Sequence, residues 1–542
     1  MSVSRRELLS WLIGAPLAAQ ACRRSRRGVA GSIRGGAMSS GHRLVSREHP
    51  SLERASGPAQ RTGIAIVGAG ISGLSAAWRL ERLGERDYTI FELEGKPGGT
   101  SGYDTDGVVP YPWGAHYVPV PGRDNRALAA LLQEIGAIER QPDGKFRGRE
   151  GVLVREADER IFVNGAWHGG LFPTLLASAD DRAELRRFDE ETRRWAAFRD
   201  AQGRRAFSLP MHASSNAAEL TVLDRMSAAE WLKQRRFSSK LLEWYVDYAC
   251  RDDYGLTLSA TSAWAMLFYF ASRVHEPGQS SAAFLTWPEG NGRLVAHLAE
   301  SAGSRLRVGQ LVSDVVQDES GVDLAVLDVA TQKLRRYRAD AVVLAAPQFV
   351  AAKLLRSWRE KPPDHLGRFS YGSWFVANLH LSRRPRSAGH ELSWDNVLYD
   401  SPSLGYVVAT HQRLLDRGPT IFTYYQPLAG ADPREARRRL SELEHRDFCD
   451  AILADLGRAH ADLEDCVERI DVWRWGHAMV RPVPGFIWSG ARQKAMQPVG
   501  RVHFAHSDLS GLALFEEAQD RGVRAAEAIL AARGRQFASL LG

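Results

Sequence analysis

The segment from Ile64 to Leu80 constrains the fold of this chain more than any other. Its first four residues are apolar and mostly β-branched, which predicts a buried strand, and Gly68, Gly70 and Gly73 follow at G-x-G-x-x-G spacing. Apolar residues then recur at helical spacing from 74 to 83, which predicts a helix directly after the glycines. A strand, a glycine turn and a helix in this order are typical of a site that holds the pyrophosphate of a dinucleotide at the helix N-terminus.

A carboxylate follows the glycines at the separation that such a site needs. Residues 88–91 predict a second strand, and Glu92 stands at its end. In dinucleotide-binding units an acid about 20 residues beyond the glycines accepts hydrogen bonds from ribose hydroxyls. Glu92 therefore favours a dinucleotide site over a chance glycine loop.

The N-terminus has the features of an export signal. Arg5 and Arg6 resemble a twin-arginine motif, and the apolar run at 8–19 is too short to span a bilayer. Small residues precede Cys22, so either the segment is cleaved there or Cys22 carries a lipid that attaches the protein to a membrane surface. We expect the twin-arginine export machinery to deliver the protein to the periplasm or beyond. The alternative is the frayed basic N-terminus of a cytosolic protein.

The charge distribution excludes a nucleic-acid-binding surface. Residues 1–61 carry 11 of the 71 basic residues and 3 of the 64 acidic ones, which leaves 60 and 61 for the rest of the chain. The net charge of +7 therefore comes from the N-terminus, and the remainder is almost neutral. The basic stretch at 23–60 lacks periodicity and predicts a disordered tether.

Cysteine and histidine spacing predicts neither a disulfide framework nor a metal site. Cys250, Cys449 and Cys466 are widely separated, and we expect them to be buried free thiols. No spacing typical of haem, zinc or an iron–sulfur cluster occurs. His503 and His506 form an H-x-x-H pattern without a third ligand, so we interpret them as structural.

Several segments beyond Glu92 together resemble one superfamily. The pair Gly98-Gly99 follows the acid closely, and the segment 113–118 reads W-G-A-H-Y-V. A buried strand at 340–347 ends in Ala-Pro, and the segment 499–518 combines a strand, Asp508 and the start of a helix. These features resemble the FAD-binding parts of flavin-containing amine oxidases, phytoene desaturases and protoporphyrinogen oxidases.

The resemblance implies an α/β fold with two lobes. A Rossmann-like FAD-binding domain would be interleaved with a mixed α+β substrate domain, as in amine oxidases. The implied division is a signal segment at 1–22, a tether at 23–60, the FAD-binding domain at 61–122, 284–349 and 491–535, and the substrate domain at 123–283 and 350–490.

The resemblance also implies FAD as the cofactor and identifies the residues around it. Paired glycines in relatives close the backbone over the phosphates, small residues pass beside the ring, and an acid binds the ribityl hydroxyls. The residues placed against FAD in this way are Gly68, Ala69, Gly70, Ser72, Gly73, Glu92, Gly98, Gly99, Thr100, Gly114, Ala115, His116, Val312, Asp508 and Leu514.

Some positions depart from the family pattern. Thr100 stands where relatives commonly have an arginine, Val376 where amine oxidases place a lysine under the flavin, and Leu514 near one tyrosine of the pair that sandwiches the amine. His506 and Glu517 also differ from the usual glycines. The attachment cysteine of covalent members is absent, so the resemblance implies non-covalent FAD.

The resemblance implies an FAD-dependent oxidoreductase that transfers hydride from a small-molecule substrate to the flavin, with oxygen or another acceptor completing the cycle. An amine or polyamine C–N bond is the favoured target. Two alternatives stay open, namely a desaturase-like C–C oxidoreductase with an apolar substrate and a non-catalytic flavin-bearing or electron-transfer partner. The cofactor itself carries most of the chemistry, so few catalytic side chains are expected. The candidates are His116 and Asn378.

Overall fold

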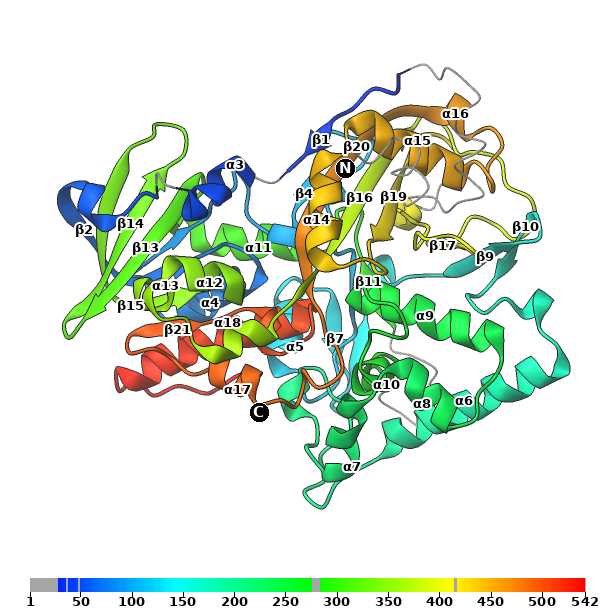
Figure 1. Ribbon diagram of the computed structural model, residues 1–542, viewed down its shortest axis with the longest axis horizontal. Helices are drawn as coiled ribbons and strands as arrows, with labels where there is room; N and C mark the ends of the chain where they lie inside the picture. The colour runs from blue at the N-terminus through cyan, green and yellow to red at the C-terminus, as the bar shows by residue number, and fades with distance from the viewer. Residues whose placement is uncertain (1–27, 36–37, 47–48, 275–282, 414–416, 542) are drawn as a thin grey trace.

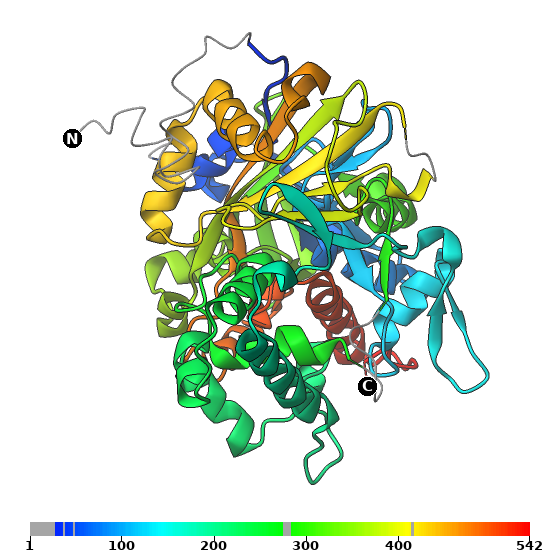
Figure 2. The same cartoon turned by 90° about the vertical axis from the view of Figure 1, so that its right-hand side faces the viewer.

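A computed structural model of the chain describes residues 28–35, 38–46, 49–274, 283–413 and 417–541. The predicted signal segment, with Arg5, Arg6 and Cys22, lies outside the described residues. Figure 1 shows two lobes side by side, each built on a large sheet, and Figure 2 shows that helices cover the lower part of one lobe. The predicted α/β, two-lobe fold is confirmed. In the described part of the chain, no helix has the length and hydropathy needed to cross a bilayer.

The first lobe contains a seven-stranded sheet with the strand order β12-β3-β2-β15-β14-β13, to which β21 adds beside β15. Its centre is parallel, because β2 pairs in parallel with both β3 and β15. The strands are β2 (Ser56–Val67), β3 (Tyr88–Phe91), β12 (Leu306–Arg307), β13 (Gln310–Asp318), β14 (Gly321–Asp328), β15 (Leu334–Leu344) and β21 (Val502–Phe504).

Helices close one face of this sheet. Helix α4 (Ile71–Arg82) follows the glycine turn, and its apolar side chains share one core with α11 (Gly292–Ala302) and α18 (Phe515–Ala532). Helices α4 and α18 approach closely, since a Cβ on Gly522 would lie 2.1 Å from the carbonyl oxygen of Ser72. Helix α5 (Arg126–Glu134) packs on the same core through the apolar face that its sequence presents.

The second lobe contains an eight-stranded sheet with the order β1-β20-β16-β19-β18-β17-β9-β10. Its long central strands are antiparallel, whereas β9 and β17 pair in parallel. The strands are β1 (Ile33–Arg34), β9 (Glu159–Val163), β10 (Ala166–Gly169), β16 (Tyr371–Leu381), β17 (Asp395–Leu398), β18 (Tyr406–Val408), β19 (Thr420–Pro427) and β20 (Val467–Val480).

The helical part of this lobe contains α6 (Ala179–Ala197), α8 (Ala228–Gln234), α9 (Lys240–Tyr254) and α10 (Ala263–Ser272) around one aromatic-rich core. The aromatic-rich apolar pattern continues from 228 to 248, yet two helices form there. The chain turns at Arg236, where φ is +57°, and Ser239 then caps α9 by accepting a hydrogen bond from the Leu242 amide at 3.2 Å. Polar capping chemistry therefore outweighs the continuous apolar pattern.

The prediction of a disordered tether over 23–60 is wrong for its described residues. Strand β1 pairs in parallel with β20, where Arg34 contacts the buried Asp471 at 3.0 Å. Helix α3 (Met38–Gly41) follows, and β2 begins as early as Ser56. The order comes from partners far away in the sequence, such as Asp314, which accepts a hydrogen bond from the Leu52 amide at 3.1 Å. Local composition carries no sign of such partners.

The three described cysteines are free and buried, which confirms the expectation for Cys250, Cys449 and Cys466. Among the described residues, no cluster of three or more His, Cys, Asp or Glu side chains is arranged to hold a metal ion. His503 lies in β21, inside the first sheet, whereas His506 lies beyond that strand.

Candidate active site

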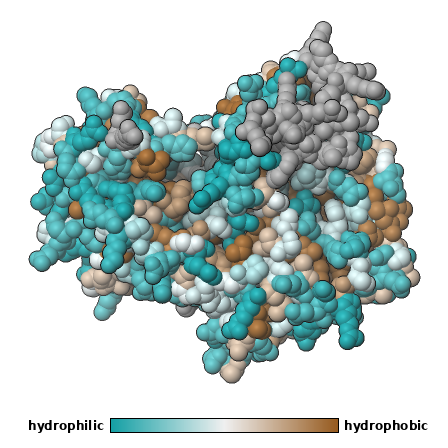
Figure 3. Space-filling model, viewed as in Figure 1, coloured by the Kyte–Doolittle hydropathy of each residue, from teal (hydrophilic) through white to brown (hydrophobic). Residues whose placement is uncertain are grey.

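A cavity of about 1560 Å³ extends between the two lobes. Gly68, Glu92 and Ala345 line it directly after the parallel strands β2, β3 and β15. The carboxyl ends of parallel strands are where α/β folds bind ligands. The opposite wall comes from β16, β17 and β20 of the second lobe. The face shown in Figure 3 is largely hydrophilic and is hollowed at its upper edge between the lobes.

In the glycine turn, on one side of this cavity, backbone segments pack closely against each other. Gly68 has φ of +99°, which favours glycine, and a Cβ on Gly73 would lie 1.9 Å from the Gly68 carbonyl oxygen. Gly70 differs, because a Cβ there would meet no heavy atom within 4 Å. Gly70 is also the N-cap of α4 and offers no side-chain cap, so the first amide groups of the helix are left for a ligand.

Glu92 closes the turn from the neighbouring strand. One carboxylate oxygen accepts a hydrogen bond from the Ala69 amide at 2.6 Å, and the other accepts one from the Glu94 amide at 2.9 Å. Burial raises the pKa of the Glu92 carboxyl. Each oxygen has further lone pairs, and the side chain lines the cavity, so it has capacity for ligand hydroxyl groups.

The second glycine pair brings another loop against the first. Gly98 and Gly99 have φ of +119° and +56°, and the Gly98 amide donates to the Ala69 carbonyl at 2.8 Å. A Cβ on Gly114 would lie 2.6 Å from the Thr100 carbonyl oxygen, so this position also requires glycine. These contacts place the backbone of 98–100 and 114–115 at the cavity wall without side chains in the way.

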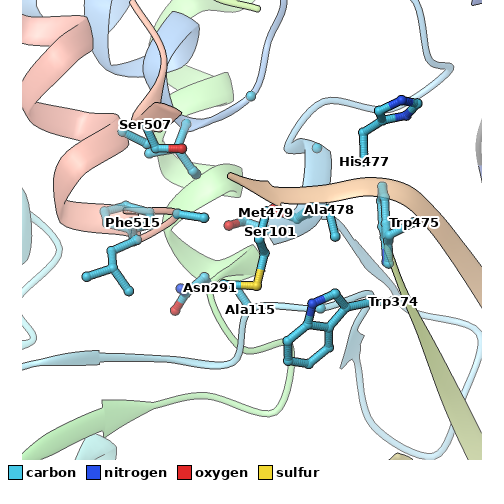
Figure 4. A pocket seen from close by; sticks show the side chains of 18 of the residues that line it. Ser101, Ala115, Asn291, Trp374, Trp475, His477, Ala478, Met479, Ser507 and Phe515 are labelled. Carbon is cyan, nitrogen blue, oxygen red and sulfur yellow. The ribbon is translucent and has the colours of Figure 1, made fainter. Parts of the chain in front are cut away.

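The N-terminus of α18 points into the middle of the cavity. Leu514 is its N-cap and gives no side-chain cap, and Phe515 and Glu516 follow at the wall. Figure 4 shows Ser507 and Phe515 on one side and Trp374 and Trp475 on the other, with Met479 between them. The positive end of the helix dipole is thus directed at the space beside Ala115.

Most residues predicted to contact a cofactor line this cavity, and three do not. Ala69 uses its amide for Glu92, and Gly73 permits close packing inside the turn. Asp508, expected to bind ribityl hydroxyls, accepts hydrogen bonds through Oδ2 from the Gln348 amide and the Tyr371 hydroxyl, both at 2.7 Å, whereas its buried Oδ1 has no hydrogen-bond partner among the described residues. The residues that do line the cavity are Gly68, Gly70, Ser72, Glu92, Gly98, Gly99, Thr100, Gly114, Ala115, His116, Val312 and Leu514.

The cavity wall also holds buried polar atoms that lack a partner. Ser72 Oγ and Asn291 Oδ1 both lie at the wall, and neither has a hydrogen-bond partner among the described residues. Native proteins rarely leave such atoms unpaired, so they indicate a polar ligand in this part of the cavity. Together with the open space at Gly70 and the uncapped helix α4, they form a cradle for a phosphate-bearing cofactor.

Comparison with protein families identifies the group to which this cradle belongs. The sequence profile of flavin-containing amine oxidoreductases matches residues 71–530. The chain belongs to this family. It is therefore an FAD-dependent oxidoreductase, as the sequence predicted. No curated protein sequence matches the chain.

Several solved structures have the same fold as this chain. Structures of putrescine oxidase, among them a wild-type form bound to putrescine, have 19% sequence identity and a TM-score of 0.64, and cover 88% of this chain and 100% of their own. Cyclohexylamine oxidase from Brevibacterium oxydans has 18% identity and a TM-score of 0.61 with the same coverage. At this level of sequence identity, the structural similarity establishes that the fold is shared.

The residues of this flavin-dependent enzyme fit FAD. The turn at 68–72 and the N-terminus of α4 would hold the pyrophosphate, Glu92 a ribose, and the backbone at 114–115 the ring. When bound, FAD supplies the hydride acceptor. The dipole of α18 favours negative charge at its N-terminus and so would favour the reduced ring. No described cysteine lines the cavity, and non-covalent attachment of FAD stays a prediction.

Of the two candidate catalytic residues, the cavity includes His116 and excludes Asn378. Asn378 is fully buried in β16, where it donates to the Pro112 carbonyl at 3.0 Å and accepts from the Thr423 hydroxyl at 2.8 Å. It therefore tethers strands, and the catalytic hypothesis for it is withdrawn. Burial lowers the pKa of His116 to about 4, so its imidazole is uncharged at neutral pH.

Aromatic rings surround His116 on the substrate side. Its ring centroid lies 5.0 Å from that of Tyr425 and 5.3 Å from that of Trp394. The Tyr425 hydroxyl donates to the Gly114 carbonyl at 2.8 Å, which ties this aromatic wall to the loop beside the cofactor site. Val376, at the expected lysine position, also lines the cavity, so the departure from the amine oxidase pattern lies within the site.

The sequence reasoning missed the acidic residues of the cavity. Glu159, Asp252, Asp395 and Glu516 all line it, although they come from β9, α9, β17 and α18. Asp395 stands alone and the other three each have an acidic neighbour in the sequence, but no spacing connects the four segments. Only the tertiary fold brings them to one cavity.

Proposed function

We propose that this enzyme oxidises an amine, removing hydride from the carbon bonded to nitrogen. The observation that carries the proposal is the combination of aromatic rings and half-buried acids on the substrate side of the cavity. Aromatic faces and carboxylates both stabilise an ammonium group, and the uncharged His116 presents no positive charge to it. The similar solved structures are described as putrescine and cyclohexylamine oxidases, which supports the same substrate class.

The desaturase alternative fits this cavity less well. An apolar polyene would bury the carboxylates of Asp252 and Asp395 against hydrocarbon, which costs several kcal/mol for an ionised group that has no cation to pair with. An amine would instead supply the missing positive charge and hydrogen-bond donors. The acidic lining therefore favours C–N over C–C oxidation.

Substrate-dependent bleaching of the flavin tests the proposal. The purified flavoprotein is mixed anaerobically with a panel of primary, secondary and cyclic amines and with apolar polyenes, and the flavin absorbance is followed. We expect at least one amine to bleach the flavin and no polyene to do so, with peroxide detected once oxygen is admitted if oxygen is the acceptor. Bleaching by dithionite alone would refute amine oxidation and support the electron-transfer alternative.

We propose further that residues 1–22 direct the protein through the twin-arginine pathway to the periplasm. The support is the Arg5-Arg6 pair, the short apolar run and the small residues before Cys22. Replacing Arg5 and Arg6 by lysine is expected to retain the protein in the cytoplasm. Unchanged periplasmic recovery of that variant would refute the pathway, and radiolabelled palmitate in the wild type but not in Cys22→Ala would establish the lipid anchor.

A further inference from the structure

Three acids on the substrate side of the cavity lie on neighbouring elements. Strands β9 and β17 pair in parallel, and Glu159 and Asp395 are register partners across them. Asp252 projects from α9 into the same cavity. Like charges directly opposite each other across a sheet destabilise it, so this arrangement costs stability unless something compensates.

Arg273 lines the same cavity and its charge acts to lower the pKa of Asp252, but among the described residues no basic side chain forms an ion pair with these three acids. Arg273 is committed to Asp253 at 3.1 Å, and no Lys, Arg or His forms an ion pair with Glu159, Asp252 or Asp395. Burial raises the pKa of Glu159 and of Asp252 to about 7, and that of Asp395 also rises. A cation placed among them would reverse these shifts, because opposite charge favours the ionised form.

A fourth acid gives an independent sign of a ligand. Glu516 is 4% exposed, lines the cavity from the N-terminus of α18, and its Oε1 has no hydrogen-bond partner among the described residues. It belongs to the element beside the predicted ring site, whereas Glu159 and Asp395 belong to the far sheet. Negative charge is therefore presented from two walls of one cavity.

The remaining walls are aromatic and favour an organic cation. Tyr117 and Trp394 meet edge to face at 5.8 Å between centroids, and Tyr248 lines the cavity next to Asp252 on α9. Rings of this kind stabilise an ammonium group through cation–π contact. A metal ion fits less well, because no group of three or more ligating side chains in the described chain is arranged to hold one.

We propose that Glu159, Asp252 and Asp395 form an anionic subsite that binds the second cationic group of a substrate with two or more amino groups. The inference rests on the proposed amine oxidation and specifies its substrate class. One amino group of an aliphatic diamine or polyamine would lie by the aromatic wall at His116 and be oxidised there. The other, protonated, would remain at the three carboxylates.

The test compares a diamine with a monoamine of equal carbon length. Initial rates are measured with 1,4-diaminobutane and butylamine for the wild type, Glu159→Gln, Asp252→Asn and Asp395→Asn. Glu243→Gln is the matched control, because Glu243 lies on the exposed face of α9 and pairs there with Lys240 at 2.6 Å. Binding of hexamethonium, a bis-quaternary ammonium ion, is measured by calorimetry on each holoprotein, with tetramethylammonium as the single-charge control.

We expect the wild type to prefer the diamine. Each cavity variant should lose roughly 10- to 100-fold in kcat/KM for the diamine, mainly through KM, because the negative charge that attracts the ammonium group is removed. The loss for butylamine should stay below about threefold on the same scale. Hexamethonium affinity should fall in parallel, and Glu243→Gln should match the wild type throughout.

Two results would overturn the subsite, namely equal losses for both amines and hexamethonium affinity that no variant changes. Failure of the underlying function has a different signature. If the wild type oxidises no amine, amine oxidation is refuted, and hexamethonium then decides the subsite alone. Binding that the three substitutions weaken would uphold it, and absent or unaltered binding would refute it. Circular dichroism of each variant separates these losses from misfolding.

Discussion

Two glycines of the cofactor turn make a matched pair for testing the cradle. A Cβ on Gly73 would lie 1.9 Å from the carbonyl oxygen and 3.0 Å from the carbonyl carbon of Gly68, both backbone atoms. A Cβ on Gly70 would meet no heavy atom within 4 Å, and Gly70 has φ of −69°, which any residue adopts. Gly73→Ala should therefore disturb the fold itself, whereas Gly70→Ala should disturb only what binds in front of the turn.

The size of the Gly73 effect follows from the overlap. Relieving a contact at 1.9 Å requires α4 to move from β2 by more than 1 Å, roughly the shortfall from ordinary van der Waals separation. The chain cannot relax by rotating a side chain, because the opposing atoms are backbone. Overpacking of this kind typically costs about 1–3 kcal/mol, and this backbone contact should lie at or above the upper end of that range.

The assay separates stability from cofactor affinity. FAD is removed from the wild type and both variants, and urea unfolding of each apoprotein is followed by tryptophan fluorescence. We expect Gly73→Ala to lower the free energy of unfolding of the first lobe by about 2–3 kcal/mol. The free energy of unfolding of Gly70→Ala should equal that of the wild type within about 0.5 kcal/mol, the usual range for a surface substitution. On reconstitution, it should bind FAD at least about tenfold more weakly, because the methyl group occupies the phosphate cradle.

The pattern of the two variants decides the outcome. If Gly73→Ala unfolds like the wild type, the close approach of α4 to the turn is not what requires glycine there. If Gly70→Ala binds FAD normally, the space in front of the helix is not where the pyrophosphate lies. A loss of apoprotein stability in Gly70→Ala would refute the assignment of that glycine to ligand approach.

Three further predictions concern other parts of the site. Removing residues 1–48 deletes the stretch at 38–45 that contributes to the cavity wall, so FAD should dissociate faster than from a chain lacking only residues 1–27, as measured by flavin fluorescence after dilution. Glu159 and Asp252 have pKa values raised to about 7 by burial, so in the apoprotein they bind protons that the unfolded chain releases between about pH 4 and pH 7. Their contribution to stability should thus be lost as pH rises through that window, and the doubly substituted Gln/Asn variant should show a flatter thermal-unfolding profile against pH. Tyr425→Phe removes the hydrogen bond to Gly114 and should cost about 0.5–1.5 kcal/mol in urea unfolding, while amine KM changes little because the ring remains.

The sequence predicted the cofactor half of the cavity well because its geometry is local. The roles of Gly68 and Gly73 follow from a strand, a tight turn and a helix within twenty residues, and steric rules alone fix them. The pair Gly98-Gly99 and Gly114 obey the same logic, because each brings backbone close to other backbone. Such requirements can be read from a sequence without knowledge of the partner segment.

Positions that depend on distant partners were predicted less well. Arg34 is held by Asp471, and Asp508 turns toward Tyr371 and the Gln348 amide, so in each case the partner lies more than a hundred residues away. Asn378 is similar, since its amide joins Pro112, 266 residues away, to Thr423, 45 residues away. A motif identifies the residue type at such a position, but the side-chain direction depends on which hydrogen-bond partner the fold presents.

The acids of the substrate side show why these two halves differ. A cofactor shared by many proteins imposes one backbone shape, and that shape leaves glycines at fixed spacing. A substrate imposes only charge and volume, which any element facing the cavity can supply, and here carboxylates come from β9, α9 and β17. Half-buried acids without an ion-pair partner lower the stability of the unliganded protein, so their presence is best explained by a ligand that carries the missing charge. By this reasoning the unpaired charge of Glu159, Asp252 and Asp395, more than any resemblance in the flavin motifs, distinguishes a polycationic amine from an apolar substrate.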